Sequence, residues 1–205
     1  MTDFRDRLTL LEQRREVLLR EASALTEAQL TFKPMQGAWS ILQVIEHLLL
    51  VEGGIVERVT TRPPRAVRPR VRDRLGYAAV WVALAYGMRI KAPIQSVMPS
   101  KGITLSEAAE QWRVMLRSLS EHLATVRDDS LKLTVFKHPI GGPMTLAEAL
   151  LFITRHFDHH LRQIARIRSS AGFPKTKTSG AARDAVASVD HLSTQPPSSS
   201  PRDRM

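Results

Sequence analysis

Apolar residues recur at helical spacing along most of the chain, with charged and polar residues between them. In the first segment, Leu8, Leu11 and Leu18 follow one another at intervals of three and seven residues. This spacing places apolar side chains on one face and predicts a helix over residues 3–22. The same reasoning predicts further helices over 40–60, 74–90, 104–126 and 145–169.

Three of these helices have a recognisable start. In each, a hydroxyl residue is followed three positions later by Gln or Glu, and the pairs are Ser40–Gln43, Thr104–Glu107 and Thr145–Glu148. Such a capping box satisfies the first free amides of a helix from both side chains. A shorter helical turn is expected after Thr26, before the break at Pro34 and Gly37.

The helices predict an all-α fold, an antiparallel four-helix bundle over residues 1–170 in which 74–90 is an extra inserted helix. The stretch LKLTVFKHPIGGPM (131–144) alternates briefly, and we expect only marginal strand pairing there. Residues 171–205 end in Ser, Pro and charge and cannot bury enough apolar surface to fold. They are predicted to be a disordered tail.

The composition of the chain limits the kinds of functional site that it can form. The chain has 205 residues, 43% of them hydrophobic, and no cysteine. One core is therefore expected, and disulfides, thiolate zinc sites and cysteine nucleophiles are excluded. The N-terminal residues lack an apolar signal stretch and no segment reaches the roughly 20 apolar residues of a membrane span, so we expect a cytoplasmic protein without a transmembrane segment.

The formal charge of +10 raises the question of nucleic-acid binding. Residues 62–74 (RPPRAVRPRVRDR) contain six arginines and one aspartate and supply half of that charge. No aromatic residue is interleaved, and no known DNA-binding spacing accompanies them. A solvated basic loop is favoured and a nucleic-acid partner is unlikely, although binding of nucleic acid or an anionic membrane through this loop stays open as an alternative.

Three of the seven histidines fall within HFDHHLRQI (156–164). His156 and His160 lie roughly 40° apart on one helix, on the face that carries its apolar residues. His159 is rotated roughly 60° from His156 and is expected at the edge of the site or in solvent. Gln163 returns to the histidine side, where its amide can orient a ring or contact a ligand.

His47 lies at the border of the apolar stripe of the helix over 40–60. Three inward imidazoles on two helices are the donor set of a catalytic-type metal site with open positions. Zinc, nickel, iron and manganese all accept such ligands. The alternative is that these are core histidines with ordinary hydrogen-bond partners, which is the more frequent role for a single inward histidine.

Two blocks together, WSILQVIEHLLLVE (39–52) and HPIGGPMTLAEALLFITRHFDHHLRQIARI (138–167), resemble the DinB/YfiT-like superfamily of metalloenzymes. The resemblance covers about residues 4–168 and is weak through 62–100. It implies a four-helix bundle, often homodimeric, with a divalent metal on His47, His156 and His160. The doubled His159-His160 leaves open whether His159 substitutes as a ligand.

The resemblance also implies a reaction class. Members include S-transferases that use low-molecular-weight thiols such as mycothiol or bacillithiol, and a thiol-dependent maleylpyruvate isomerase. We therefore expect a metal-dependent thiol transferase or hydrolase with a small-molecule substrate. A non-catalytic stress-response or scaffold protein with a structural metal is the alternative.

Other side chains near the predicted site have less specific roles. Trp39 is expected to pack against the helix start with Val44, and substrate stacking is the lesser option. Asp158 is expected in solvent. Aromatic residues of the inserted helix are expected to fill the core or line a pocket; they are Tyr77, Trp81 and Tyr86. The carboxylates that flank His47 have no clear inward orientation; they are Glu46 and Glu52.

Overall fold

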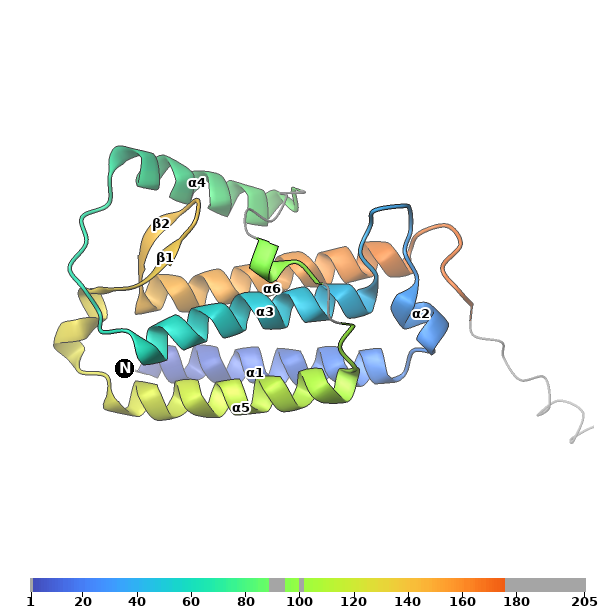
Figure 1. The fold of residues 1–205 in the computed structure, drawn as a ribbon, viewed down its shortest axis with the longest axis horizontal. Coiled ribbons are helices and arrows are strands. Elements are labelled where there is room, and N and C mark those ends of the chain that lie inside the picture. The colour runs from blue at the N-terminus through green and yellow to red at the C-terminus, as the bar shows by residue number, and fades with distance from the viewer. Residues whose placement is uncertain (1, 89–94, 100–101, 176–205) are drawn as a thin grey trace, which may run out of the picture. The chain divides into compact units, whose positions relative to one another are not determined.

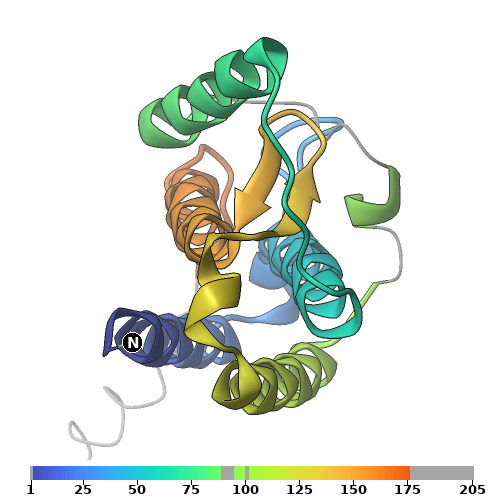
Figure 2. The same cartoon turned by 90° about the vertical axis from the view of Figure 1, so that its left-hand side faces the viewer.

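Four long helices frame the part of the chain that the structure, a computed structural model, describes: residues 2–88, 95–99 and 102–175. They are α1 (Thr2–Ser23), α3 (Ile41–Thr61), α5 (Leu105–Thr125) and α6 (Leu146–Arg168), shown in Figure 1. α3 packs against α5 and α6, and α1 packs against the same two helices. Figure 2, seen along the helices, shows them at the four corners of a bundle. The predicted four-helix bundle is confirmed.

Two helices of the bundle run one way and two run the other (Figure 1). α1 and α6 are parallel, because Arg14 bonds to Asp158 and, further along both helices, Glu21 bonds to Arg168. α3 and α5 share the opposite direction. The long connection between α3 and α5 returns the chain to the end at which α3 begins, so α5 repeats the direction of α3.

The capping residues set the helix starts. All three predicted boxes form, with each hydroxyl accepting the amide three residues on and each Gln or Glu accepting the amide of the cap. A fourth box, Thr26 with Gln29, starts the short helix α2 (Glu27–Thr31). The four bundle helices begin and end within one residue of their predicted bounds. Two short 3₁₀ helices, η1 (Gln95–Val97) and η2 (Asp128–Lys132), lie in the connections.

A β-hairpin stands where only marginal strand pairing was expected. β1 (Thr134–His138) and β2 (Gly142–Thr145) pair antiparallel, and Arg65 adds a bridge to Thr134. The expectation was wrong because a short alternating sequence does not reveal the tertiary contacts that stabilise the strands. The hairpin packs against α3 and α6, and Phe136 and Met144 are buried there.

The inserted helix is α4 (Val71–Tyr86), which begins three residues before the predicted 74 and stops at Gly87. Gly87 adopts the left-handed conformation with φ 66°, which ends the helix at a residue that tolerates it. Residues 89–90 of the prediction lie outside the described residues. α4 packs against α6 and β2, above the hairpin in Figure 1.

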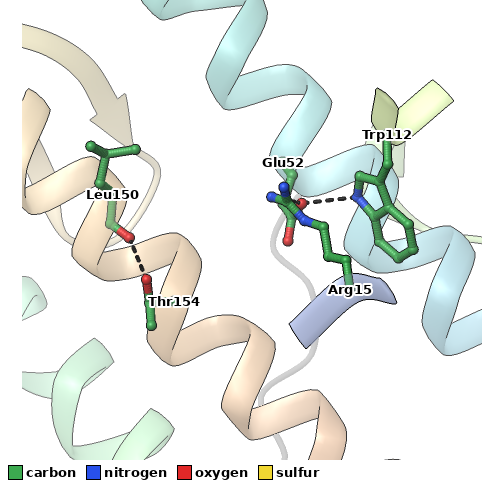
Figure 3. Close-up of polar contacts among 5 residues, drawn as sticks. All are labelled: Arg15, Glu52, Trp112, Leu150 and Thr154. Carbon is green, nitrogen blue, oxygen red and sulfur yellow. Dashed lines mark hydrogen bonds and ion pairs between the residues drawn. The ribbon is translucent and has the colours of Figure 1, made fainter. Parts of the chain in front are cut away.

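A buried ion pair ties three helices together (Figure 3). Arg15 of α1 donates to the Glu52 carboxylate of α3 at 2.6 Å, and the Trp112 indole of α5 donates to the same oxygen at 2.9 Å. Burial raises the pKa of Glu52, although Arg15 opposes the shift. The Glu52 carboxylate therefore binds side chains of α1 and α5.

The bundle unit extends to Pro174. Phe173 meets Phe32 edge to face at 5.6 Å, and Gln29 donates to the Pro174 carbonyl at 2.8 Å. Residues 176–205, most of the predicted tail, lie outside the described residues. Within the described ranges, no helix combines the length and the apolar character needed to cross a bilayer.

Candidate metal centre

Three buried histidines meet between two helices of the bundle. α3 supplies His47, and α6 supplies His156 and His160, one turn apart. Each ring offers a nitrogen such that the three atoms lie within 4.8 Å of one another. The three residues are 4%, 8% and 6% exposed. The structure thus brings together all three predicted ligand residues.

Hydrogen bonds at the outer nitrogens fix two of the rings. His47 Nδ1 lies 2.6 Å from the Val97 carbonyl, which can only accept, so Nδ1 carries the proton. His160 Nδ1 lies 2.8 Å from the Gln163 amide oxygen and is likewise the donor. Both rings therefore present an unprotonated Nε2. These bonds are the orienting contacts that metal-bound histidines usually make.

The third ring faces the second at close range. His156 Nε2 lies 3.1 Å from His160 Nε2, and its own Nδ1 is buried without a hydrogen-bond partner among the described residues. Two nitrogens of a tetrahedral zinc site, each about 2.0–2.1 Å from the ion, are about 3.3 Å apart. The spacing of this pair therefore fits a shared cation.

All three imidazoles are held in the neutral form. Burial, followed by the charges that His160 and His47 would carry, holds the pKa of His156 well below its ordinary value. Burial lowers the pKa of His160 to about 3, and it lowers the pKa of His47 despite the bond to Val97. Neutral imidazole is the form that binds metal. The donor set, its protonation and the spacing of the His156–His160 pair fit a divalent ion.

Trp39 forms one wall of the site instead of only packing at the helix start. Its ring centroid lies 4.7 Å from that of His47 and 6.4 Å from that of His160, nearly parallel to the latter. Trp39 stands outside α3, just before the Ser40 cap, so helical periodicity could not place its ring. The indole covers the site with an apolar surface.

His159 lies at the edge, as predicted. Its ring centroid is 4.9 Å from that of His160, and the two rings are nearly perpendicular. His159 is half-buried and outside the converging group. Burial and then Arg162 lower its pKa. The geometry favours His160 over His159 as the third ligand.

His138 ends β1 and supports the site indirectly. Its Nδ1 accepts the amides of Ile140 at 3.1 Å and Gly141 at 2.8 Å, which closes the hairpin turn. Its ring centroid lies 4.8 Å from that of Phe152. The Phe152 ring stacks on His156 with a centroid distance of 5.4 Å. Burial lowers the pKa of His138 to about 4. The His-Pro-Ile-Gly-Gly turn was the only signal for this role.

Two further expectations need correction. Asp158 does not stand free in solvent, because it accepts from Arg14 at 2.6 Å across α1 and α6 with its side chain 28% exposed. Tyr86 is 82% exposed and does not fill the core. Tyr77 and Trp81, 5.5 Å apart, are half-buried against the core, which is the core-filling role.

Comparison with known proteins decides the family. Residues 10–164, more than half of the chain, match the model of the DinB superfamily. The chain belongs to the DinB superfamily. Among curated proteins, this DinB chain is 24% identical over 152 residues to the uncharacterized protein YuaE of Bacillus subtilis, a match that spans 72% of this chain and 88% of YuaE.

Two solved structures share the fold of this DinB protein. One is TT2238, described as a four-helix bundle protein, with 21% identity and a TM-score of 0.50 over 78% of this chain and 97% of that one. The other is YfiT of Bacillus subtilis, with 21% identity and a TM-score of 0.52 over 80% of this chain and 84% of YfiT. YfiT is described as a probable metal-dependent hydrolase with an unusual four-helix bundle topology.

Proposed function

We propose that this DinB-superfamily chain is a divalent-metal-dependent enzyme with His47, His156 and His160 as its metal ligands. One observation carries the proposal: three buried, neutral imidazoles from two helices converge within 4.8 Å. Three protein ligands leave coordination positions open, which distinguishes catalytic from structural zinc-type sites. Zinc, nickel, iron and manganese are all compatible with this donor set.

The residues of the chain prepare the site before any substrate binds. Val97 and Gln163 hold the rings of His47 and His160 in the tautomer that presents Nε2. Trp39 shields the same rings, and the burial of all three residues keeps protons off them. A bound divalent ion supplies Lewis acidity, which lowers the pKa of a water or a thiol sulfur and so provides a nucleophile at neutral pH.

For the reaction, we propose attack of such a nucleophile on a small electrophilic substrate. Thiol S-transfer with a low-molecular-weight thiol and hydrolysis are the two forms, and they differ in whether sulfur or water attacks. The family resemblance supports the former, and the description of YfiT as a probable metal-dependent hydrolase supports the latter. A homodimer in the cytoplasm, built from a bundle over 1–170 with a tail over 171–205, remains part of the proposal.

Turnover assays on metal-loaded and metal-free protein test this function. Ester and thiol-plus-electrophile substrates are screened with the wild type, with H156A and with the matched control H122A, whose histidine lies on α5 outside the site. The proposal expects turnover that requires the metal, is lost in H156A and is kept in H122A. Metal that raises the melting temperature without supporting any turnover would favour the structural-metal alternative.

A further inference from the structure

The outward face of α4 is apolar over its whole length. Val71 is 75% exposed, Leu75 68%, Val82 51% and Tyr86 82%. Three exposed alanines, Ala78, Ala79 and Ala85, lie between them. At 100° per residue all seven fall within roughly 120° of arc, on one side of the helix. A surface helix normally turns charged and polar residues outward, so this face is inverted.

The opposite face of α4 is already packed. Val80, Ala83 and Leu84 are buried, and α4 contacts α6 and β2. Arg162 of α6 donates to the Leu84 carbonyl and holds the end of the helix. Gly76 lies so close to the hairpin turn that a Cβ there would meet the Ile140 carbonyl oxygen at 2.1 Å. The exposed stripe is therefore additional to the face by which α4 docks.

Arginines border this stripe on both sides. Arg72 and Arg74 lie roughly 100° and 60° from Val71 in opposite directions around the helix, and both are exposed. The four preceding arginines are exposed as well; they are Arg62, Arg65, Arg68 and Arg70. Asp73 is the one carboxylate of residues 62–88 in the sequence, and it accepts the Arg70 amide at 2.8 Å. The segment therefore presents apolar surface and nearly uncompensated positive charge together.

We propose that residues 62–88 form a peripheral binding surface for an anionic lipid bilayer. The apolar stripe of α4 enters the boundary between headgroups and acyl chains, and the arginines contact the anionic headgroups. A second copy of the chain would cover the apolar stripe but bring no exposed carboxylate from this segment to Arg72 and Arg74. A nucleic acid would satisfy the arginines but leave the apolar stripe in water. The lipid surface satisfies both, and it does so independently of the metal site.

Flotation of the full-length protein with vesicles tests this surface. One set of vesicles is phosphatidylcholine alone, and the other is equal parts phosphatidylcholine and phosphatidylglycerol, at low salt. We expect flotation only with the anionic set. R72Q/R74Q should weaken partitioning by about fivefold for each arginine. L75S/V82S should weaken it at least about tenfold, since two inserted apolar side chains are lost.

Control variants remove two arginines or one exposed valine elsewhere on the surface. R20Q/R117Q, with one substitution on α1 and one on α5, lowers the net charge by as much as R72Q/R74Q does. V114S removes an apolar side chain that is 59% exposed on α5. Both should float like the wild type, and circular dichroism should be unchanged in all variants.

Four outcomes would contradict the proposal. It would be overturned if R20Q/R117Q reduced flotation as much as R72Q/R74Q does, or if the wild type did not float at all. A dimer in the absence of vesicles that L75S/V82S dissociates would assign the stripe to a second copy instead. Tight binding to a DNA duplex that L75S/V82S leaves intact would assign the arginines to nucleic acid.

Discussion

The Gln163 amide oxygen lies 2.8 Å from His160 Nδ1, one turn along α6. This contact holds the imidazole in the tautomer that turns its Nε2 toward His47 and His156. The contact joins the Gln163 amide oxygen to the outer nitrogen of the His160 ring. Its effect on the site is therefore indirect, through the orientation and protonation of His160.

Replacement of Gln163 should weaken metal binding without emptying the site. We expect Q163A to lower the affinity for a divalent metal by about 10- to 100-fold, the usual cost of removing a contact behind a metal ligand. Competition titration against a chromogenic chelator measures this loss. Q111A, at an exposed position of α5, is the matched control and should bind like the wild type. Equal affinities for Q163A and Q111A would show that the bond does not support the site.

The metal-free protein should lose stability as the pH falls below the ordinary histidine value. The folded-state pKa of His160 is lowered from 6.5 to about 3, so between these values the unfolded chain binds a proton that the folded chain does not. The contribution of the buried, neutral His160 to the free energy of unfolding is therefore complete above pH 6.5. This contribution declines as the pH falls, by at most about 1.4 kcal/mol per pH unit. Urea unfolding of metal-free wild type and H160A across this range measures the difference. The free energy of unfolding should fall less steeply with decreasing pH in H160A than in the wild type. Equal slopes would contradict the lowered pKa of His160.

The buried ion pair should respond differently to single and double replacement. E52L leaves Arg15 as a buried, unpaired cation and should cost about 3–5 kcal/mol. The double variant R15M/E52L removes both charges and should recover most of that loss. Arg15 Nε and Nη1 and Glu52 Oε1 have no hydrogen-bond partner among the described residues, which limits what the pair contributes. Denaturant unfolding checks both values.

The exposed pair Arg168–Glu21 provides the comparison. Its atoms are 3.3 Å apart with side chains 46% and 59% exposed, so R168A should cost less than about 1 kcal/mol. A double variant at Arg15 and Glu52 as unstable as E52L alone would mean that packing volume, and not charge, dominates at this site.

The hairpin turn depends on the absence of a side chain at Gly142. This residue has φ 71°, and a Cβ there would lie 2.5 Å from the Asp73 Cβ. Gly102 has a similar φ of 67°, and among the described residues no atom beyond its chain neighbours lies within 4 Å of an added Cβ, so G102A carries only the backbone penalty of about 1–2 kcal/mol. G142A should be clearly less stable than G102A, because it must also displace Asp73 from the start of α4. Thermal unfolding of the two variants separates the backbone penalty from the cost of displacing Asp73. Equal losses of stability in G142A and G102A would show that Asp73 moves freely.

Local signals were sufficient for the bundle and for the three histidines that converge. Capping pairs such as Thr145–Glu148 act within one turn, so the sequence alone located the helix starts. His156 and His160 are four residues apart on one helix, and the period of the α-helix placed them on one face. His47 required only that its own helix turn the same stripe inward.

Other parts of the site depend on contacts that helical periodicity does not encode. Val97 reaches His47 from a short 3₁₀ helix 50 residues away. Trp39 precedes its helix, so its direction follows from the chain before the cap. The Arg15–Glu52 pair joins two helices through charges that composition alone would place in solvent. The hairpin needed the support of α3 and α6, which no local pattern reports.

Metal content combined with X-ray absorption of the purified full-length protein tests the central claim most directly. The protein is prepared without chelator, and its H47A, H156A, H160A and H159A variants are prepared in the same way. The account predicts about one divalent ion per chain with three imidazole nitrogens near 2.0–2.1 Å if the metal is zinc. The ion should be lost in the first three variants and retained in H159A, with helical circular dichroism preserved in all. A wild-type protein that binds no divalent metal under any loading condition, or one that keeps its metal in H156A, would contradict it.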